Sequence, residues 1–172
     1  MRFLIRLAAV LAMVNIAPIA SAALAPAIYW TDSNLSRIYK SNLDGTGQST
    51  VVSSGLIDPR GIVVDQRGAG ALYWADRGTN RIERSNLDGS GRQILVANLG
   101  DPNHLALDFD AGRIYWTDSI QRTIQRINLN GSDVQVLVSD DLYGPYGIDI
   151  DKENGHVYWA DAIGSPPPSK IS

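Results

Sequence analysis

The sequence contains no cysteine, and this absence removes one way of stabilising the fold. Small domains that are exported to oxidising compartments commonly rely on disulfide bonds. Without cysteine the chain must obtain its stability from packing alone, and 172 residues are enough to bury an adequate hydrophobic core. The sequence therefore excludes a disulfide scaffold and predicts a fold that is held together by packed secondary structure.

Residues that commonly carry catalytic chemistry are also scarce. The only two histidines are His104 and His156, and there is no Gly-x-Ser-x-Gly, no phosphate-binding glycine motif and no His-x-x-x-His pair. The acidic segments 108–112 and 149–155 lack the sixth-position glycine and the twelfth-position glutamate of a hand-type calcium loop. We therefore expect no catalytic residues, no cofactor and no metal site.

Long apolar runs are absent except at the N-terminus. Two arginines precede the apolar stretch 7–19, and Ala20-Ser21-Ala22 fits a small-residue cleavage site, as in a secretory signal peptide. We predict that residues 1–22 are a signal peptide and that residues 23–172 are secreted or periplasmic, with no membrane span after cleavage. The alternative is an uncleaved membrane anchor, but an asparagine and a proline interrupt the stretch.

Basic residues are too few for a nucleic-acid-binding surface. Without residues 1–22, the chain keeps 13 of its 15 lysines and arginines against 18 aspartates and glutamates. Binding to a phosphate backbone needs clustered positive charge. We therefore expect no nucleic acid among the partners of this chain.

A repeat of 42 to 44 residues dominates the rest of the sequence. All four tryptophans follow a tyrosine, and the successive Tyr-Trp pairs are separated by 44, 42 and 43 residues. A fixed period of this size is typical of solenoids and propellers, in which one supersecondary unit is repeated. The pairs are Tyr29-Trp30, Tyr73-Trp74, Tyr115-Trp116 and Tyr158-Trp159.

Each repeat is predicted to form four short strands. An apolar segment such as Ile62-Val63-Val64 comes first, the Tyr-Trp strand second, a polar strand such as 81–87 third, and a strand such as 93–96 last. Turns that contain glycine or Asn-Leu-Asp-Gly separate these strands. The apolar first strand indicates burial on both faces, whereas the charged third strand indicates a more solvated position. Because helical periodicity is absent after the signal, the predicted fold is all-β, with radially repeated sheets as in a β-propeller.

The quartets Tyr29-Trp-Thr-Asp32 and Tyr115-Trp-Thr-Asp118, with variants at 73–76 and 158–161, resemble the YWTD repeats of the low-density lipoprotein receptor family. The Asn-Leu-Asp-Gly turns and the Pro-x-Gly-Ile-x-x-Asp segments are also similar to the class B repeat of that family. The resemblance implies a six-bladed YWTD propeller with four-stranded blades and the quartet on the second strand. The absence of cysteine favours a bacterial exported member over an animal receptor ectodomain. The repeats lie near 23–54, 55–97, 98–139 and 140–172.

The motif residues are expected to serve the scaffold. Tyrosine and tryptophan at fixed blade positions would fill the space between sheets while their polar tips find partners. The closing aspartates would accept hydrogen bonds from backbone N–H groups and so connect neighbouring segments. The structural set is Tyr29, Trp30, Asp32, Tyr73, Trp74, Asp76, Tyr115, Trp116, Asp118, Tyr158, Trp159 and Asp161.

Ligands of propellers usually meet one rim, built from the loops that lead into the first strands and the loops between the second and third strands. Residues at this rim that differ between the repeats are the best candidates for ligand contacts, because the fold alone would make equivalent positions alike. Aromatic residues and arginine are also enriched at binding hot spots. The candidate ligand-binding residues are Arg60, Arg77, Asn103, His104, Tyr143 and Tyr146.

The predicted function is extracytoplasmic binding of a protein or glycan ligand through the rim, without catalysis. In the resembled family such propellers act in ligand recognition and release, which makes this role plausible here. The alternative is an exported propeller enzyme, a lactonase-like hydrolase or a lyase, with its active site in the central channel.

The number of repeats leaves two hypotheses open. The chain holds about three and a half of the six blades that the resemblance implies, and Lys170-Ile171-Ser172 matches the opening of a third strand. Either the sequence is incomplete at its C-terminus, which the extra strands favour, or two half-rings associate edge to edge as a dimer that covers their open sheet edges.

Overall fold

The computed structural model describes residues 25–162, which form strands and turns only. The predicted signal peptide and the segment Lys170-Ile171-Ser172 lie outside these residues. Within them, thirteen strands form four separate antiparallel sheets, and consecutive strands are neighbours in every sheet. The predicted all-β propeller fold with four-stranded blades is confirmed by this arrangement.

The four sheets are named blades A to D in chain order. Blade A contains β1 (Ile28–Asp32), β2 (Arg37–Ser41) and β3 (Ser49–Val52). Blade B contains β4 (Pro59–Asp65), β5 (Ala71–Asp76), β6 (Arg81–Ser85) and β7 (Gln93–Val96). Blade C contains β8 (Pro102–Asp108), β9 (Arg113–Asp118), β10 (Thr123–Asn128) and β11 (Gln135–Val138). Blade D contains β12 (Pro145–Asp151) and β13 (His156–Asp161).

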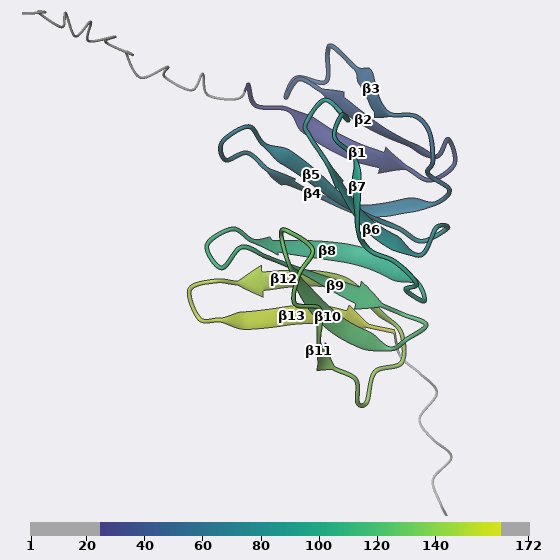
Figure 1. The fold of residues 1–172 in the computed structure, drawn as a ribbon, viewed down its shortest axis with the longest axis vertical. Coiled ribbons are helices and arrows are strands. Elements are labelled where there is room, and N and C mark those ends of the chain that lie inside the picture. The colour runs from purple at the N-terminus through teal and green to yellow at the C-terminus, as the bar shows by residue number, and fades with distance from the viewer. Residues whose placement is uncertain (1–24, 163–172) are drawn as a thin grey trace, which may run out of the picture.

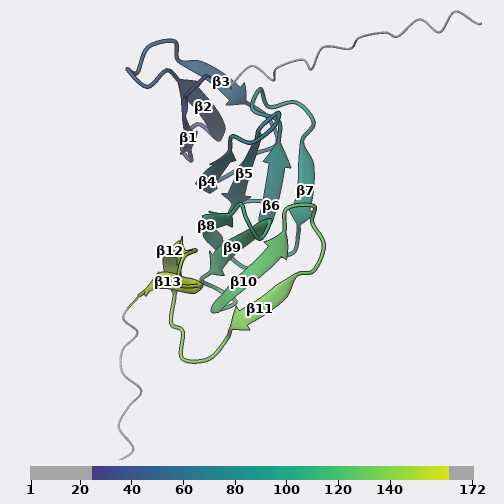
Figure 2. The ribbon, with the colours of Figure 1, turned by 90° about the vertical axis from the view of Figure 1, so that its left-hand side faces the viewer.

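The blades are stacked face to face along the chain and fan outward. In Figure 1 blades A, B and C follow one another down the molecule from the purple N-terminal sheet, and the yellow strands of blade D overlap blade C in this view. Figure 2 shows the first strands β4, β8 and β12 along one side of the stack and the fourth strands β7 and β11 along the other. The first strand of each complete blade is therefore the inner strand of the fan.

Glycine at position 61 allows two inner strands to approach closely. A Cβ atom on Gly61 would lie only 2.7 Å from the carbonyl oxygen of Asn103 and 2.7 Å from the Cα atom of His104. Any larger residue would push β4 away from β8, which explains why blade B has glycine at this position.

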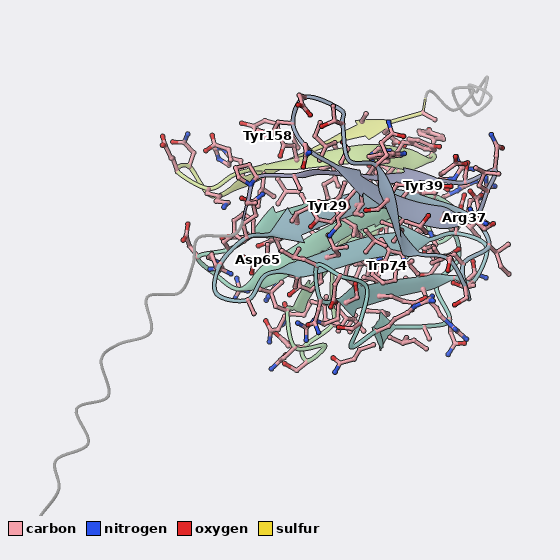
Figure 3. The ribbon with its side chains drawn as sticks, turned by 90° about the horizontal axis from the view of Figure 1, so that it is seen from above. Tyr29, Arg37, Tyr39, Asp65, Trp74 and Tyr158 are labelled. Carbon is pink, nitrogen blue, oxygen red and sulfur yellow. The ribbon has the colours of Figure 1, made fainter. Side chains whose placement is uncertain are left out.

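Two hydrophobic cores lie between the blades. Ile38 and Val52 of blade A pack with Leu72 and Trp74 of blade B, and a second cluster joins blade B to Trp116 and its neighbours in blade C. Trp74 and Trp116 have no exposed surface. Figure 3 shows Trp74 in the interior and Tyr158 near the margin of the molecule. The second strands of blades B and C thus each contribute a tryptophan to the interface with the preceding blade.

The expectation that tryptophan polar tips find partners is wrong for the two buried residues. The indole Nε1 atoms of Trp74 and Trp116 have no hydrogen-bond partner within the described part of the chain. The Trp74 ring instead lies beneath the guanidinium group of Arg92, 5.4 Å from the ring centroid. Packing and this cation–π contact replace the expected hydrogen bond at Trp74.

The expectation that the third strands are solvated is also wrong. Glu83 and Ser85 on β6 are buried, as are Thr123 and Gln125 on β10, whereas the exposed residues concentrate on β7 and β11. The carboxylate of Glu83 is paired with Arg92, whose Nη2 atom lies 2.8 Å from Oε1. A buried charge is tolerated when it is paired and hydrogen-bonded, and here the partner comes from the segment before β7.

Candidate binding surface at one rim

The rim is the end of the blades where the second strands finish and the inner strands begin. It comprises the loops 33–36, 77–80 and 119–122, the connecting segments 53–58, 97–101 and 139–144, and the first residues of β4, β8 and β12. Backbone hydrogen bonds join loops to segments, for example from the N–H of Arg77 to the carbonyl of Asp58 at 2.9 Å and from that of Ser119 to Asp101 at 3.1 Å.

The motif aspartates fix these loops. The buried carboxylate of Asp118 accepts hydrogen bonds from the N–H groups of Gly100 at 2.8 Å, Asp101 at 2.9 Å and Gln121 at 2.9 Å. Asp76 accepts hydrogen bonds from four backbone N–H groups in the equivalent way, and Asp161 accepts them from two. Each carboxylate therefore ties the connecting segment of its blade to the end of the second strand.

Motif threonines join neighbouring blades just below the rim. The hydroxyl of Thr31 donates to the carbonyl of Arg60 at 2.6 Å, and the hydroxyl of Thr117 donates to the carbonyl of Tyr146 at 2.6 Å. Thr117 also accepts a hydrogen bond from the N–H of His104 at 3.3 Å. Blade B has Ala75 at this position, so its link to blade C lacks the hydroxyl.

A network of charged side chains, alternately basic and acidic, runs from blade B to blade C. The guanidinium of Arg60 pairs with Asp58 at 2.9 Å, and that of Arg77 lies 3.8 Å from Asp58 and 2.6 Å from Asp101. The hydrogen bond from Arg60 to Asp58 raises the pKa of Arg60. Asp101 accepts a further hydrogen bond from the hydroxyl of Ser119 at 2.6 Å. Because carboxylates hold both partly exposed arginines, the positions of these side chains on the rim are fixed.

The side-chain amide of Asn103 supports this network of charged side chains. Its Nδ2 atom donates to the carbonyl of Asp101 at 3.0 Å and to the hydroxyl of Ser119 at 3.1 Å. The Asn103 side chain is almost completely buried, so it positions its neighbours and is not itself a contact surface.

His104 and Tyr146 continue the rim toward blade D. Their ring centroids lie 5.5 Å apart with a tilt of 47°. Burial lowers the pKa of His104, and the positive charge of Arg60 lowers it further. His104 is therefore neutral near pH 7 and offers an aromatic face with a polar edge beside Arg60.

Exposed apolar side chains surround these polar groups. Ile120 is 70% exposed and Ile57 is 60% exposed, although both are large aliphatic residues. Leu35, Tyr143 and Tyr146 are also exposed and belong to the same rim. Ile57 rests against Gly78, where an added Cβ would lie 2.4 Å from its Cγ2 atom. The rim therefore combines apolar contact area with arginine and tyrosine, the composition of binding hot spots.

The structure brings most of the predicted candidates together. Arg60, Arg77 and Asn103 belong to one network, and His104 and Tyr146 form the adjoining ring pair. Tyr143 lies on the same rim, where its backbone N–H donates to Asp161 at 3.0 Å.

Sequence reasoning missed five further residues of the rim. Asp58 and Asp101 both precede the repeated proline, and this recurrence is the sequence signal by which they could have been identified. Leu35, Ile57 and Ile120 are aliphatic residues in loops where turn chemistry predicts polar side chains.

Two negative observations apply to residues 25–162. In this part of the chain no three His, Cys, Asp or Glu side chains gather in a way that could hold a metal ion. Among the same residues no helix is long and apolar enough to cross a membrane.

Comparison with family models finds the low-density lipoprotein receptor repeat class B three times, at residues 27–66, 70–109 and 112–151. The chain belongs to this class B repeat family. No curated protein matches the chain.

Solved structures agree with the propeller fold of this class B repeat chain. A crystal structure of a nidogen/laminin complex contains a chain that is 34% identical, with a TM-score of 0.71 over 78% of this chain and 51% of that chain. A gluconolactonase from Xanthomonas campestris is 23% identical, with a TM-score of 0.68 over 81% of this chain and 52% of that one. The virginiamycin B lyase of Staphylococcus aureus is 18% identical, with a TM-score of 0.62 over 83% and 53%. The chain thus spans about half the length of each, and the two enzymes share the fold alone.

Proposed function

We propose that the chain is an extracytoplasmic binding module that recognises another protein through the rim. The observation that carries this proposal is that Ile57, Ile120 and Tyr143 are exposed on the same rim as two arginines that carboxylates hold in place. Apolar and tyrosine side chains contribute contact area, and fixed arginines lose little freedom on binding. The nidogen/laminin complex supports a protein partner, because it contains a related propeller chain.

A glycan is the second candidate ligand. The exposed ring pair of His104 and Tyr146 offers an aromatic platform beside the guanidinium of Arg60. Sugar rings can stack on aromatic side chains, while arginine donates hydrogen bonds to their oxygens. A catalytic role as a hydrolase or lyase has no such support, because the enzymes among the similar structures match in fold only.

The test compares exposed residues at opposite ends of the blades. Ile120→Ser and Tyr143→Ser change the rim, whereas Leu43→Ser changes an exposed leucine in the β2–β3 turn at the other end. All three side chains are exposed, so none of the changes should disturb the core. Extracytoplasmic proteins would be cross-linked to each variant and identified, and the affinity of the identified partner would then be measured by calorimetry.

We expect the affinity for the identified partner to fall at least about tenfold for the rim variants and to stay unchanged for Leu43→Ser. A partner that binds all variants alike would refute the rim as the binding surface. Loss of a captured polysaccharide on changing Tyr146, with no protein partner captured, would establish the glycan instead.

A further inference from the structure

Two Asn-Gly pairs occur in the chain, and their surroundings differ. They are Asn130-Gly131, in the turn between β10 and β11, and Asn154-Gly155, in the turn between β12 and β13. Asparagine followed by glycine is the pair most prone to spontaneous deamidation, because glycine has no side chain to shield its backbone nitrogen from the asparagine. The reaction needs that nitrogen to be free, so the hydrogen bonds of each turn decide which pair can react.

The backbone nitrogen of Gly131 is not free. Its N–H donates to the carbonyl of Asn128 at 2.9 Å, and the same bond closes the corresponding turns of blades A and B at 3.0 Å. The Oδ1 atom of Asn130 also accepts hydrogen bonds from the N–H of Ser132 at 3.0 Å and from its hydroxyl at 2.7 Å. The turn therefore holds both reacting groups, and a reaction at Asn130 requires the turn to open.

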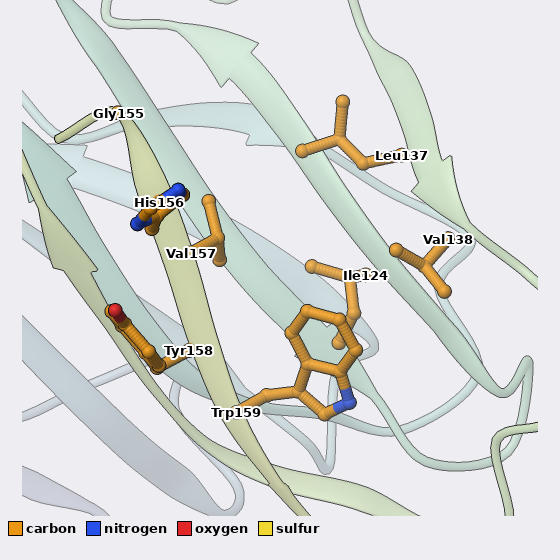
Figure 4. Close-up of a pocket in the computed structure, with 8 residues that line it drawn as sticks. All are labelled: Ile124, Leu137, Val138, Gly155, His156, Val157, Tyr158 and Trp159. Atoms are coloured by element: carbon orange, nitrogen blue, oxygen red, sulfur yellow. The ribbon is translucent and has the colours of Figure 1, made fainter.

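The backbone nitrogen of Gly155 is free. The turn 151–156 lies wholly within the described part of the chain, and no group there accepts a hydrogen bond from the N–H of Gly155. Asn154 and Gly155 are both exposed, so water reaches them. Figure 4 shows Gly155 at the turn end of β13, beyond His156 and away from Ile124. This nitrogen is therefore available as a nucleophile.

The turn itself does not need asparagine at position 154. Gly70, Gly112 and Gly155 all have positive φ, at 75°, 64° and 70°. The fold therefore requires glycine at these positions. The residues before the first two glycines are Ala69 and Ala111, so an unreactive side chain serves the same turn in blades B and C. The reactive pair is thus a distinctive feature of blade D.

Asp151 holds the amide group that would leave. The Nδ2 atom of Asn154 donates to Oδ2 of Asp151 at 2.7 Å, and the backbone N–H of Asn154 donates to Oδ1 at 3.1 Å. The amide nitrogen departs after it gains a proton, so positive charge develops on it during the reaction. A carboxylate beside this nitrogen stabilises that charge and favours its departure.

We propose that Asn154 is a site of spontaneous deamidation through a succinimide, whereas the fold protects Asn130. The nitrogen of Gly155 would bond to Cγ of Asn154 and lose its proton to water, while the Cγ–Nδ2 bond breaks and Nδ2 leaves as ammonia. Water would then add to either carbonyl carbon of the ring and open it, which leaves aspartate or isoaspartate at position 154. Water is the one co-reactant in these steps.

The conversion would change the charge of the turn. The side-chain hydrogen bond from Asn154 is the largest cause that lowers the pKa of Asp151. An aspartate at position 154 cannot donate this bond and places a second carboxylate beside Asp151, so the pKa of Asp151 should rise and the turn should loosen. The turn lies at the opposite end of blade D from the rim, so the rim should keep its structure.

The experiment follows both pairs in one sample of the full chain, which is kept folded in neutral buffer and digested with trypsin at intervals. Trypsin cuts after Arg126 and Lys152, so the two pairs fall in separate peptides, 127–152 and 153–170. Deamidation raises the mass of a peptide by about 1 Da. Asn154 is the only asparagine of the second peptide, and fragment spectra separate Asn130 from Asn128 in the first.

Two controls accompany this measurement. The same chain unfolded in urea gives the rate of each pair without the fold. Asn154→Ala introduces the residue that blades B and C have at this position, so it should leave the turn intact and remove the reactive amide.

We expect Asn154 of the folded chain to deamidate at least about tenfold faster than Asn130, the factor that follows from breaking one backbone hydrogen bond. In urea the two rates should lie within about threefold of each other. Asn154→Ala should show no change of mass in peptide 153–170. Equal rates in the folded chain, a faster reaction at Asn130, or no conversion of Asn154 would each overturn the proposal.

Discussion

Replacing Thr117 by valine should weaken the connection between blades C and D. The substitution keeps the shape of the side chain but removes the hydroxyl that donates to the carbonyl of Tyr146 at 2.6 Å and accepts from the N–H of His104 at 3.3 Å. Thr117 is fully buried, so the two backbone groups cannot regain water without local opening. Leaving one partly buried carbonyl unpaired costs about 1.5 kcal/mol, and the long bond to His104 adds little.

The assays are urea unfolding of the full chain, followed by tryptophan fluorescence, for the free energy of unfolding, and thermal unfolding for the melting temperature. For a protein of this size, about 1.5 kcal/mol corresponds to a melting temperature lowered by about 3–6 °C. Thr31→Val is the comparison variant and should lower the free energy of unfolding by less, because Thr31 has one such bond, to the carbonyl of Arg60, and a less buried position. A loss below about 0.5 kcal/mol for Thr117→Val would refute the reasoning that the motif hydroxyl links the blades.

Three further predictions follow from the same geometry. Ala75→Thr should raise the free energy of unfolding by about 1 kcal/mol, because its hydroxyl would reach the carbonyl of Asn103 as Thr117 reaches that of Tyr146; a destabilised variant in urea unfolding would contradict this. Asp118→Asn should lower the free energy of unfolding by about 2 kcal/mol, because three backbone N–H groups point at the carboxylate, whereas the exposed change Asp44→Asn should alter it by less than about 0.5 kcal/mol. Burial lowers the pKa of His104, so below about pH 6.5 the unfolded chain binds the proton more readily and stability falls as the pH drops toward the folded-state pKa. His104→Gln should remove this part of the decline between about pH 7.5 and about pH 5.5, and an unchanged slope would exclude His104 as its source.

The blade architecture could be predicted from the sequence because it depends on a period. Tyr73-Trp74 and its three counterparts mark one strand per repeat, and Asp88-Gly89 marks a hairpin turn whose glycine has a φ of 85°. Both signals are local, so they require no knowledge of which residues meet in space.

The burial of the third strands could not be predicted in the same way. Glu83 looks like a surface residue in the sequence, and only the approach of Arg92 from the next hairpin arm makes its burial favourable. The missing partners of the Trp74 and Trp116 indoles have a similar cause, because the space around them is filled by side chains of a different blade. Partners that come from another strand are invisible to strand alternation.

The candidate binding surface could be predicted from the sequence only in part. Arg60, His104 and Tyr146 break the repeat and could be selected for that reason, and the structure places them together. Asp58 and Asp101 occupy equivalent positions in blades B and C, so differences between the repeats do not identify them. Their role depends on Arg77 reaching between two blades, which is a property of the stacked sheets.

Site-specific photo-crosslinking tests the rim as a binding surface most directly. A photoreactive amino acid would replace Ile120 at the rim in one variant and Leu43 at the opposite end in another, since both side chains are exposed. Each variant would be irradiated with the extracytoplasmic proteins of its source, and the adducts would be identified by mass spectrometry. The account predicts one dominant protein adduct from position 120 that is absent from position 43. Adducts from position 43 alone, or the same adducts from both positions, would contradict it.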